Sequence, residues 1–527
     1  MGRLLWLLLA ACLALGVGRA ARAETAISAL AAPGFDQIRA GVETLGRSGD
    51  PRALPVIAAL HDGALYVRAD HALFVRGSTG FVDAATGAPA PDVAAGSLKK
   101  VRVNNAIREA INDALGSLRL FAADPGVREV AAEAVFHAHD PHALAALDRA
   151  LATETHPDVR RAMVQARAAA LLFAPAASTP DRLDAVATLR ARGGMAARSL
   201  LDQMTGQPPP IGAAAAAAVT AIDRNLQLWN LVQGVYYGIS LGSILLLAAA
   251  GLAITFGVMG VINMAHGEMV MLGAYTTFVV QGLVLAFAPA MSAISVLIAI
   301  PAAFAVSGVL GIVIERTLIR WLYGRPLETL LATWGLSLIL QQGVRTVFGA
   351  SNRAVATPAW MSGEGHLGGL TLTYNRLAII VFAFLVLAGL MAVLRFTPLG
   401  LRMRAVTQNR LMASAMGIRT PRIDALTFGL GSGVAGMAGV ALSQIDNVSP
   451  NLGQGYIIDS FMVVVFGGVG NLWGTVLGAL TLGIANKFLE PVAGAVLGKI
   501  VVLVMIILFI QRKPRGLFPL KGRAVEA

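Results

Sequence analysis

The amino-acid sequence predicts an all-α polytopic membrane protein of about eight transmembrane helices, preceded by an exported, mainly helical domain with a small β insertion. Of its 527 residues, 56% are hydrophobic and 14% are charged, whereas a soluble chain carries about 25% charged residues. The runs Asn225–Ala265 and Met269–Ile314 contain no Asp, Glu, Lys or Arg. Because a helix crosses the hydrocarbon core with about 20 apolar residues, each run can hold more than one span.

Residues 1–23 are typical of a signal peptide. Arg3 is followed by an apolar stretch, Leu4–Val17, that is shorter than a full span, and Ala21-Arg22-Ala23 offers a small-residue cleavage site. Cys12, the sole cysteine, ends a segment that also resembles a lipoprotein cleavage motif. We attribute this resemblance to chance in an Ala/Leu-rich segment. Cleavage would leave the exported domain without a disulfide.

Residues 24–205 are expected to form this periplasmic domain. Four dipeptides suit helix starts, because an acid caps and Pro fits the first turn: Asp50-Pro51, Asp124-Pro125, Asp140-Pro141 and His156-Pro157. Two of them continue to a Val-Arg pair, which predicts a HEAT-like stack of helix pairs, with an Ala-rich helical bundle as the equal alternative. Short β-prone pieces between residues 64 and 82 predict a small β meander.

The domain's clustered histidines, His137, His139 and His142, do not indicate a metal site. No cysteine lies near them and their spacing lacks ligand periodicity, so a solvated helix end explains them better. No catalytic constellation is recognised, and the chain is expected not to be an enzyme. The net charge of +12 lies in short arginine clusters between apolar runs rather than in a basic stripe, which argues against nucleic acid.

A linker and connecting helix at 206–228 precede a transmembrane domain at 229–511 and a tail at 512–527. The expected apolar segments are Leu231–Gly257, Asn263–Phe287, Ala293–Ile319, Leu330–Phe348, Leu377–Leu394, Ala425–Gln444, Tyr456–Gly470, Leu472–Phe488 and Val492–Ile510. Arginines near residues 316–325, 402–422 and 512–515 should be cytoplasmic by the positive-inside rule. The eight crossings assume a break or re-entry at Gly467, Gly468, Gly470 and Gly474.

The segment 396–422 is expected to be a cytoplasmic loop that couples the chain to a partner. Thr397-Pro398 and Gly417 bracket a helical stretch with small residues, which suits docking into a groove of another protein. An ordinary basic loop anchoring two spans is the alternative. The residues assigned to coupling are Arg402, Arg404, Ala405, Asn409, Ala413 and Gly417.

Several motifs in order resemble the branched-chain amino acid family of ABC transporter permeases, from about Leu231 to the C-terminus. These are Gly257–Glu268, Glu315-Arg316 with Arg325-Pro326, Thr333–Ile339 and Val465–Asn471. Within that family the chain is most similar to the branch that imports urea, on residues Arg404–Arg410, Ser443–Gln454, Asn471–Thr475 and Asn486–Pro491. The large exported domain also fits that branch.

The resemblance implies a pore-forming permease subunit in a bacterial inner membrane, which moves urea from periplasm to cytoplasm. It implies as partners a second, homologous permease subunit, two ATPase subunits and a periplasmic solute-binding protein. ATP and magnesium would bind to the ATPases. This chain is expected to bind no cofactor, since Gly494–Ile500 misses the phosphate-loop spacing and ends in Ile.

Polar residues beside the apolar spans are the candidates for the solute pathway. Asn263, His266 and Glu268 could line it, since ionisable groups at such depth suggest function, although His266 and Glu268 could instead cap a short membrane turn. Asp446 and Asn447 could form the outer entry or a simple turn, and Asn471 lies at the proposed helix break. Gln341, Gln342 and Arg345 are expected at the outer surface. The glycines 429, 433, 436 and 439 predict tight helix packing.

Three alternatives to a urea permease stay open from the sequence. The first is a branched-chain amino acid permease of the same family, which the sequence distinguishes from a urea permease only by the motif matches and the exported domain. A stand-alone secondary transporter or channel would usually bury several ionisable residues for ion coupling, and few are present. A membrane-anchored receptor would leave the many spans and the coupling segment unexplained.

Overall fold

The computed structural model describes residues 26–48, 52–77, 80–91, 93 and 98–518. The predicted signal peptide, the Asp50-Pro51 dipeptide and the end of the tail lie outside these residues. The chain divides into two compact units, unit 1 (Met1–Leu226) and unit 2 (Gln227–Ala527). Each is described by itself.

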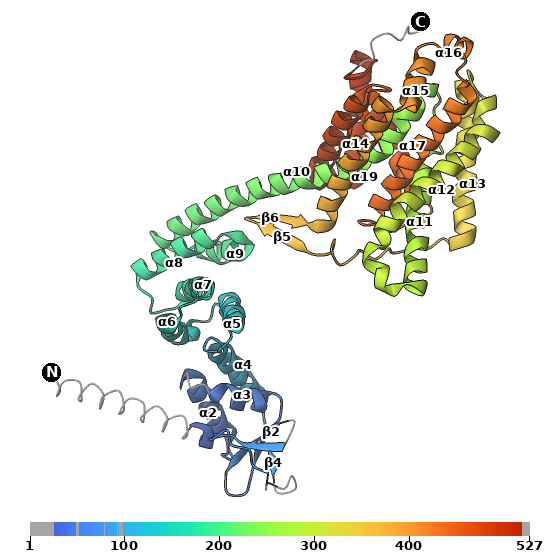
Figure 1. Cartoon of the computed structure of the whole chain (residues 1–527). Coiled ribbons are helices and arrows are strands. Elements are labelled where there is room, and N and C mark those ends of the chain that lie inside the picture. The colour runs from blue at the N-terminus through green and yellow to red at the C-terminus, as the bar shows by residue number, and fades with distance from the viewer. Residues whose placement is uncertain (1–25, 49–51, 78–79, 92, 94–97, 519–527) are drawn as a thin grey trace, which may run out of the picture. The chain divides into compact units, whose positions relative to one another are not determined.

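Unit 1 is helical, with one small sheet (Figure 1). Its helices are α2 (Phe35–Ser48), α3 (Ala53–His61), α4 (Asn105–Arg119), α5 (Pro125–Ala138), α6 (Leu144–Thr153), α7 (Pro157–Phe173), α8 (Thr179–Arg192) and α9 (Gly194–Met204), with a 3₁₀ turn η2 (Pro141–Ala143). One apolar core lies under the sheet and α2–α4, and a second lies among α5–α9 and residues 215–222.

The predicted β insertion is present between α3 and α4. Its strands are β1 (Leu65–Val67), β2 (Leu73–Gly77), β3 (Gly80–Asp83) and β4 (Lys99–Lys100), arranged antiparallel in the order β3-β2-β1-β4. Leu65 pairs with Val75 and buries its side chain in the first core. Strand β4 was not expected, because two charged lysines carry no β signal.

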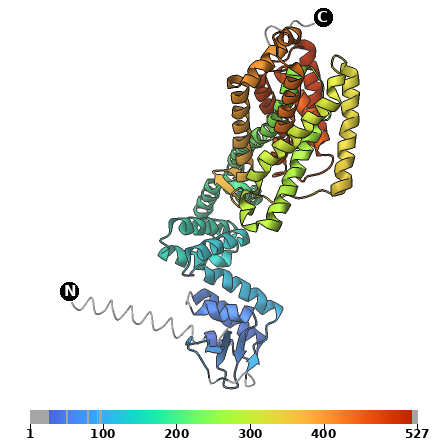
Figure 2. The same cartoon turned by 45° about the vertical axis from the view of Figure 1, so that its right-hand side comes forward.

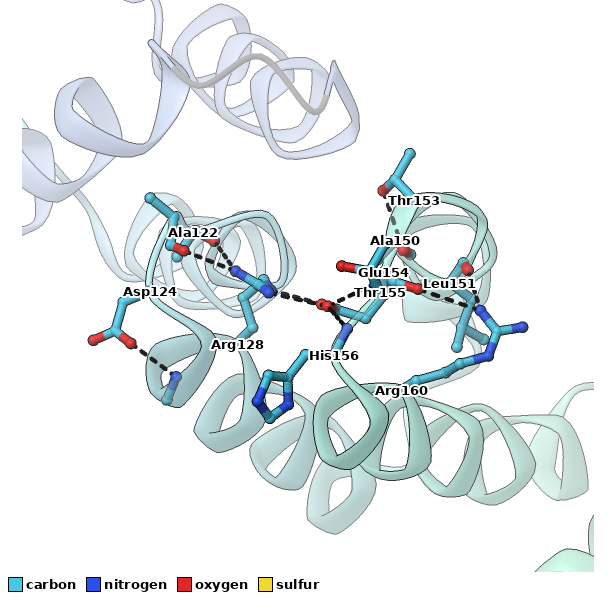
Figure 3. A network of polar contacts seen from close by, with 12 residues as sticks. Ala122, Asp124, Arg128, Ala150, Leu151, Thr153, Glu154, Thr155, His156 and Arg160 are labelled. Carbon is cyan, nitrogen blue, oxygen red and sulfur yellow. Dashed lines mark hydrogen bonds and ion pairs between the residues drawn. The ribbon is translucent and has the colours of Figure 1, made fainter.

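Three helices of unit 1 begin with the same arginine contact. Arg128 of α5, four residues after the N-cap Asp124, donates at 2.9 Å to the carbonyls of Ala122 and Ala123. Arg160 of α7 donates at 2.9 Å to the Leu151 carbonyl at the end of α6 (Figure 3). Arg182 of α8 donates at 2.8 Å to the Ala174 carbonyl.

These bonds satisfy carbonyl groups at or just after the ends of the preceding helices, which have no partner within their own helix. The Val-Arg repeat of the sequence therefore has a shared structural role at two of its sites, and α8 adds a third. The HEAT-like assignment of the domain stays a prediction.

Arg128 also pairs with a buried carboxylate (Figure 3). Its Nε and Nη2 atoms donate to Glu154 at 2.6 and 3.0 Å, and the Thr155 and His156 amides donate to the same carboxylate. These hydrogen bonds, led by that of Arg128, hold the pKa of Glu154 below its ordinary value although burial acts in the opposite direction. The pair joins the start of α5 to the end of α6.

Unit 2 is a helical bundle, seen from two sides in Figures 1 and 2. The helices are α10 (Ile211–Met259), α11 (His266–Phe287), α12 (Ser295–Thr317), α13 (Pro326–Phe348), α14 (Tyr374–Phe396), α15 (Pro398–Gln408), α16 (Arg410–Ala415), α17 (Thr420–Leu442), α18 (Leu452–Gly467) and α19 (Leu472–Arg512), with 3₁₀ turns η3 (Pro289–Ile294) and η4 (Ile319–Trp321). The expected connecting helix and first span are one helix, α10, because no proline interrupts residues 211–259.

Six helices among the described residues are long and apolar enough to cross a membrane: α10, α11, α12 with its flanking turns, α14, α17 and α19. Helix α13 is less apolar and carries Glu328 and Arg345, and α18 has 16 residues, fewer than the about 20 that a span needs. Helix α19 has 41 residues but is interrupted by non-helical Gly494. Eight crossings would require α13 and both parts of α19 to span, so that count stays a prediction.

The predicted Gly-rich break separates α18 from α19. Helix α18 ends at Gly467, and Gly468 and Gly470 adopt positive φ angles of 104° and 80° that favour glycine.

The predicted close packing of the α17 glycines is also present. A Cβ atom on Gly439 would lie 2.0 Å from the Val270 carbonyl oxygen of α11, so α17 and α11 are in backbone contact there.

A hairpin of β5 (Glu364–Leu367) and β6 (Leu370–Thr373) precedes α14 and is fixed to α10. The Gln233 side chain both donates to and accepts from the backbone of Thr371, at 3.0 and 2.9 Å. Tyr236 donates to the Thr373 carbonyl at 2.9 Å. The hairpin was not predicted, because its residues are half-exposed and have no clear alternation of apolar and polar side chains.

Candidate functional site

The chain leaves helical structure between α10 and α11, at Gly260–Ala265. Gly260 adopts a φ angle of 66°, which ends α10. Asn263 then prepares the start of α11, since its Oδ1 atom accepts from the Ala265 amide at 3.0 Å and its carbonyl accepts from His266 at 3.3 Å. A turn therefore joins α10 to α11, and Asn263 stabilises it.

A contact of His266 locates the start of α11 relative to α10. Its Nε2 atom lies 2.9 Å from the Ala248 carbonyl, and the ring is buried. Ala248 precedes the end of α10 by eleven residues, or about 16 Å of helix. The start of α11 therefore lies beside α10, about three turns before the end of that helix. Interrupted helices form solute sites in many transporters.

Glu268, in the first turn of α11, is held by α13. Its Oε1 atom accepts hydrogen bonds of 2.8 Å from both Ser337 Oγ and Gln341 Nε2. All three side chains are buried. No partner for Glu268 Oε2 is found in the part of the chain that the structure describes. One carboxylate oxygen is therefore available to accept a hydrogen bond from an amide or ammonium group.

Helix α13 supplies a polar stripe that sequence reasoning missed. Thr329, Thr333, Ser337 and Gln341 are buried and recur every four residues, so they share one face of the helix. Thr333 Oγ1 accepts from the Met264 amide at 3.1 Å, which ties this stripe to the interrupted segment. The expectation that Gln341 faces the outer surface is wrong. Its four-residue spacing from Ser337 and Thr333 was the signal for the buried face.

A small cavity of about 150 Å³ adjoins the interrupted segment. Its lining is apolar apart from Asn263, and it comes from α10, the segment itself and α18. The lining residues are Leu252, Phe256, Ile262, Asn263, Met264, Ile457, Ile458 and Phe461. The cavity provides space beside the polar cluster for a small group.

The remaining pathway candidates lie elsewhere. Asp446 and Asn447 follow α17 and are exposed, and Asp446 Oδ1 accepts from the Asn447 amide at 2.7 Å. Asn471 is the N-cap of α19, where its Oδ1 accepts from Trp473 and Gly474 and its Nδ2 donates to the Phe518 carbonyl. A turn and a helix cap explain these contacts, and they place none of the three beside Glu268.

The coupling segment folds as two short helices, α15 and α16, with Asn409 as the cap between them. Asn409 Oδ1 accepts from the Met412 amide at 2.9 Å, and Gly417 ends the segment with a φ angle of 84°. Ala413 is buried and Ala405 half-buried, whereas Arg402 and Arg404 are exposed. The segment also exposes a row of large apolar side chains: Leu401, Leu411, Met412 and Met416.

An ion pair anchors α16 to the bundle. Arg410 bonds the fully buried carboxylate of Asp424 at the start of α17. Its guanidinium lies 4.5 Å from the ring centre of Tyr323, in the loop before α13. A displacement of α16 would therefore act on α17 and on the start of α13, the helix that holds Glu268.

Comparison with known proteins identifies relatives of unit 2. A model of the family described as branched-chain amino acid transport system / permease component matches residues 234–510. The chain is 31% identical over 296 residues to the high-affinity branched-chain amino acid transport system permease protein BraD of Pseudomonas aeruginosa, covering 55% of this chain and 96% of the relative.

The permease protein LivH of Escherichia coli is 30% identical over 298 residues, with the same two coverages, 55% and 96%. A probable branched-chain amino acid permease protein LivH of Methanocaldococcus jannaschii is 24% identical over 292 residues, or 52% of this chain and 88% of the relative. No solved structure matches.

Proposed function

Because this chain belongs to the branched-chain amino acid family of ABC transporter permeases, we propose that it is the membrane-spanning subunit of an ATP-driven importer for a small polar solute. The proposal is carried by the family match over unit 2. The multi-pass helical bundle and the interrupted segment with its buried polar cluster support it. The subunit is not an enzyme, since its relatives are permease components. ATP and magnesium would act on separate ATPase subunits.

The segment of α15 and α16 would receive the ATPase. Its exposed apolar side chains, Leu411, Met412 and Met416, would enter a groove of the partner. The small residues of the segment would allow close approach to the ATPase, and its arginines would surround that contact. In this arrangement the α15–α16 side and the C-terminus are cytoplasmic, and unit 1 is periplasmic. A second permease subunit would complete the pore, and a periplasmic binding protein would deliver the solute.

Glu268 and its partners would contact the solute during passage. A free carboxylate oxygen at Glu268, with the Ser337 hydroxyl and Gln341 amide beside it, offers acceptors and donors without a fixed cation. The exposed residues Asp446 and Asn447 would belong to the outer entry. The solute would pass hydrogen-bonding groups along this pathway, and its movement would not be coupled to the movement of an ion.

Two solutes are consistent with these groups. The names of the relatives, at 30–31% identity over nearly their whole length, support branched-chain amino acids better than urea. The small apolar cavity beside Asn263 also suits an aliphatic side chain. Urea remains the second candidate because the stretches Arg404–Arg410 and Ser443–Gln454 resemble the urea branch and unit 1 lies outside the family match.

Uptake by a clean deletion strain tests the proposal. The strain would be given labelled leucine or labelled urea at low concentration, and the full chain would be returned on a plasmid as the control. Restored leucine uptake alone would establish an amino acid permease, and restored urea uptake alone would establish the urea branch.

No change for either solute would contradict both assignments. The mechanism has a separate test in vesicles that contain this subunit without its ATPases. Transport there would contradict an ABC importer and favour a stand-alone transporter or channel.

A further inference from the structure

A second, larger cavity of about 760 Å³ lies against the coupling segment, and we name it the α14–α15 cavity. Its walls come from α10, α14, α15 and the turn between α18 and α19. The lining residues are Ala253, Ile254, Gly257, Val258, Ala388, Met391, Ala392, Leu394, Arg395, Phe396, Gly400, Met403, Arg404, Thr407, Gln408, Gly470, Asn471, Leu472 and Trp473. The solute pathway proposed above does not use it.

The charge of the α14–α15 cavity has one sign. Arg395 and Arg404 are its ionisable lining residues, and no Asp or Glu lines it. Neither guanidinium forms an ion pair with a carboxylate among the described residues. Arg404 donates to the Leu394 carbonyl at 2.5 Å, and Arg395 lies 5.6 Å from the Phe396 ring centre. Both side chains are exposed and retain free N–H donors, which suit a phosphate group.

The rest of the cavity is apolar and elongated along α14. Its lining on that helix runs from Ala388 to Phe396, which lie eight positions or about 12 Å apart. This length is close to the about 15 Å thickness of the hydrocarbon in one leaflet. Arg395 lies at the end of α14 and Arg404 of α15 bonds the Leu394 carbonyl beside it. Trp473 also lines the cavity and exposes its ring, as is typical of a membrane interface.

From this arrangement we propose that the α14–α15 cavity binds an anionic phospholipid of the cytoplasmic leaflet. The phosphate would contact Arg395 and Arg404, and an acyl chain would lie along Ala388, Met391 and Ala392. Free phosphate would leave most of the cavity empty, so the lipid is the occupant that fits both charge and length. Basic pockets between helices on this side of a membrane recognise anionic headgroups.

The site has a consequence for coupling. Arg404 and Gln408 belong to α15, which continues into the ATPase-docking helix α16. A bound lipid would therefore contact one end of the coupling segment while the ATPase contacts the other. The inference depends on membrane insertion and not on the identity of the solute.

Native mass spectrometry of the full chain in mild detergent tests the proposal. Delipidated protein would be titrated with phosphatidylglycerol or with phosphatidylethanolamine. We expect one tightly held phosphatidylglycerol, weaker binding of phosphatidylethanolamine, and no displacement by inorganic phosphate. The double variant Arg395→Gln/Arg404→Gln should weaken phosphatidylglycerol binding about thirtyfold, from the loss of two attractive charges.

Arg402→Gln is the matched control, because Arg402 is exposed on the same helix but does not line the cavity. It should retain the bound lipid. Ala392→Trp keeps both arginines and fills the apolar wall, and it should also prevent binding. Equal loss in Arg402→Gln, equal binding of the two lipids, or retention in Ala392→Trp would overturn the site. So would absence of the lipid from the assembled importer, because a partner subunit would then cover the cavity.

Discussion

Gln341 of α13 donates a 2.8 Å hydrogen bond to the buried carboxylate of Glu268 at the start of α11. The bond joins two helices whose motifs lie about seventy residues apart, and it places a polar group at the depth where α11 begins. We expect Glu268→Gln and Gln341→Leu each to lower solute uptake about tenfold or more, because the first replaces the free carboxylate oxygen with a donor and the second removes one hydrogen bond of a buried carboxylate.

Uptake per chain in the membrane, with the amount quantified by immunoblot, measures this effect. Gln342→Leu is the control, since Gln342 is the exposed neighbour on the same helix. Its uptake should remain near that of the unmodified chain. Full uptake in Gln341→Leu would show that the Glu268–Gln341 contact has no part in the pathway.

We expect the ion pair between Arg410 and Asp424 to couple ATPase binding at α16 to the helical bundle. Arg410→Gln leaves the buried Asp424 carboxylate without its cation, which in comparable pairs costs about 3–5 kcal/mol. We expect the ATPase to be lost on purification of the complex and uptake to fall with it.

The double variant Arg410→Gln/Asp424→Asn removes the carboxylate as well as the guanidinium. It therefore distinguishes the cost of an unpaired buried carboxylate from the loss of the other contacts of Arg410. It should recover part of the ATPase binding. A double variant as defective as Arg410→Gln would show that the guanidinium acts on its own, through its stacking on Tyr323.

The contact between α17 and α11 should not accept a larger residue. In Gly439→Ala the new methyl group would lie 2.0 Å from the Val270 carbonyl, so the helices must separate. Overpacking of this kind costs about 1–3 kcal/mol, and we expect a lower melting temperature of the purified chain. Gly282→Ala on α11 is the control, because nothing lies within 4 Å of its added Cβ atom. Equal melting temperatures would contradict the close contact.

Unit 1 should lose local stability in acid. The Arg128 bond keeps the pKa of Glu154 below its ordinary 4.5, so the folded state favours the ionised carboxylate. The stabilisation is present above about pH 4.5 and is lost as pH falls through the lower folded pKa. Protection of residues 122–160 against hydrogen exchange in the full chain, measured relative to the intrinsic exchange rate at each pH, should therefore fall below pH 4.5.

Glu154→Gln provides the comparison for this pH dependence. It should exchange faster than the unmodified chain at neutral pH and show a weaker change on acidification. An identical acid response in both proteins would assign the effect to other groups.

The sequence was sufficient to predict a mainly helical chain with several apolar spans, because long uncharged runs are local features; the span count, the HEAT-like domain and its export stay predictions. It also located Asn263, His266 and Glu268 together at the start of α11. It did not identify Ser337 and Gln341 as the partners of Glu268, since contact between α11 and α13 depends on tertiary packing. Asn471 caps α19, and its place in the pathway stays a prediction, because a polar residue at a helix break serves either role and local sequence does not separate them.

The arginine bonds of Arg128, Arg160 and Arg182 have a consequence for how unit 1 folds. Each bond joins one helix to residues at the end of the helix before it, and α4 to α9 pack mainly on helices one or two places away in the sequence. Contacts of short sequence separation give a low contact order, which favours rapid folding. The helices of unit 1 can therefore assemble one after another, without contacts from the membrane-spanning half of the chain.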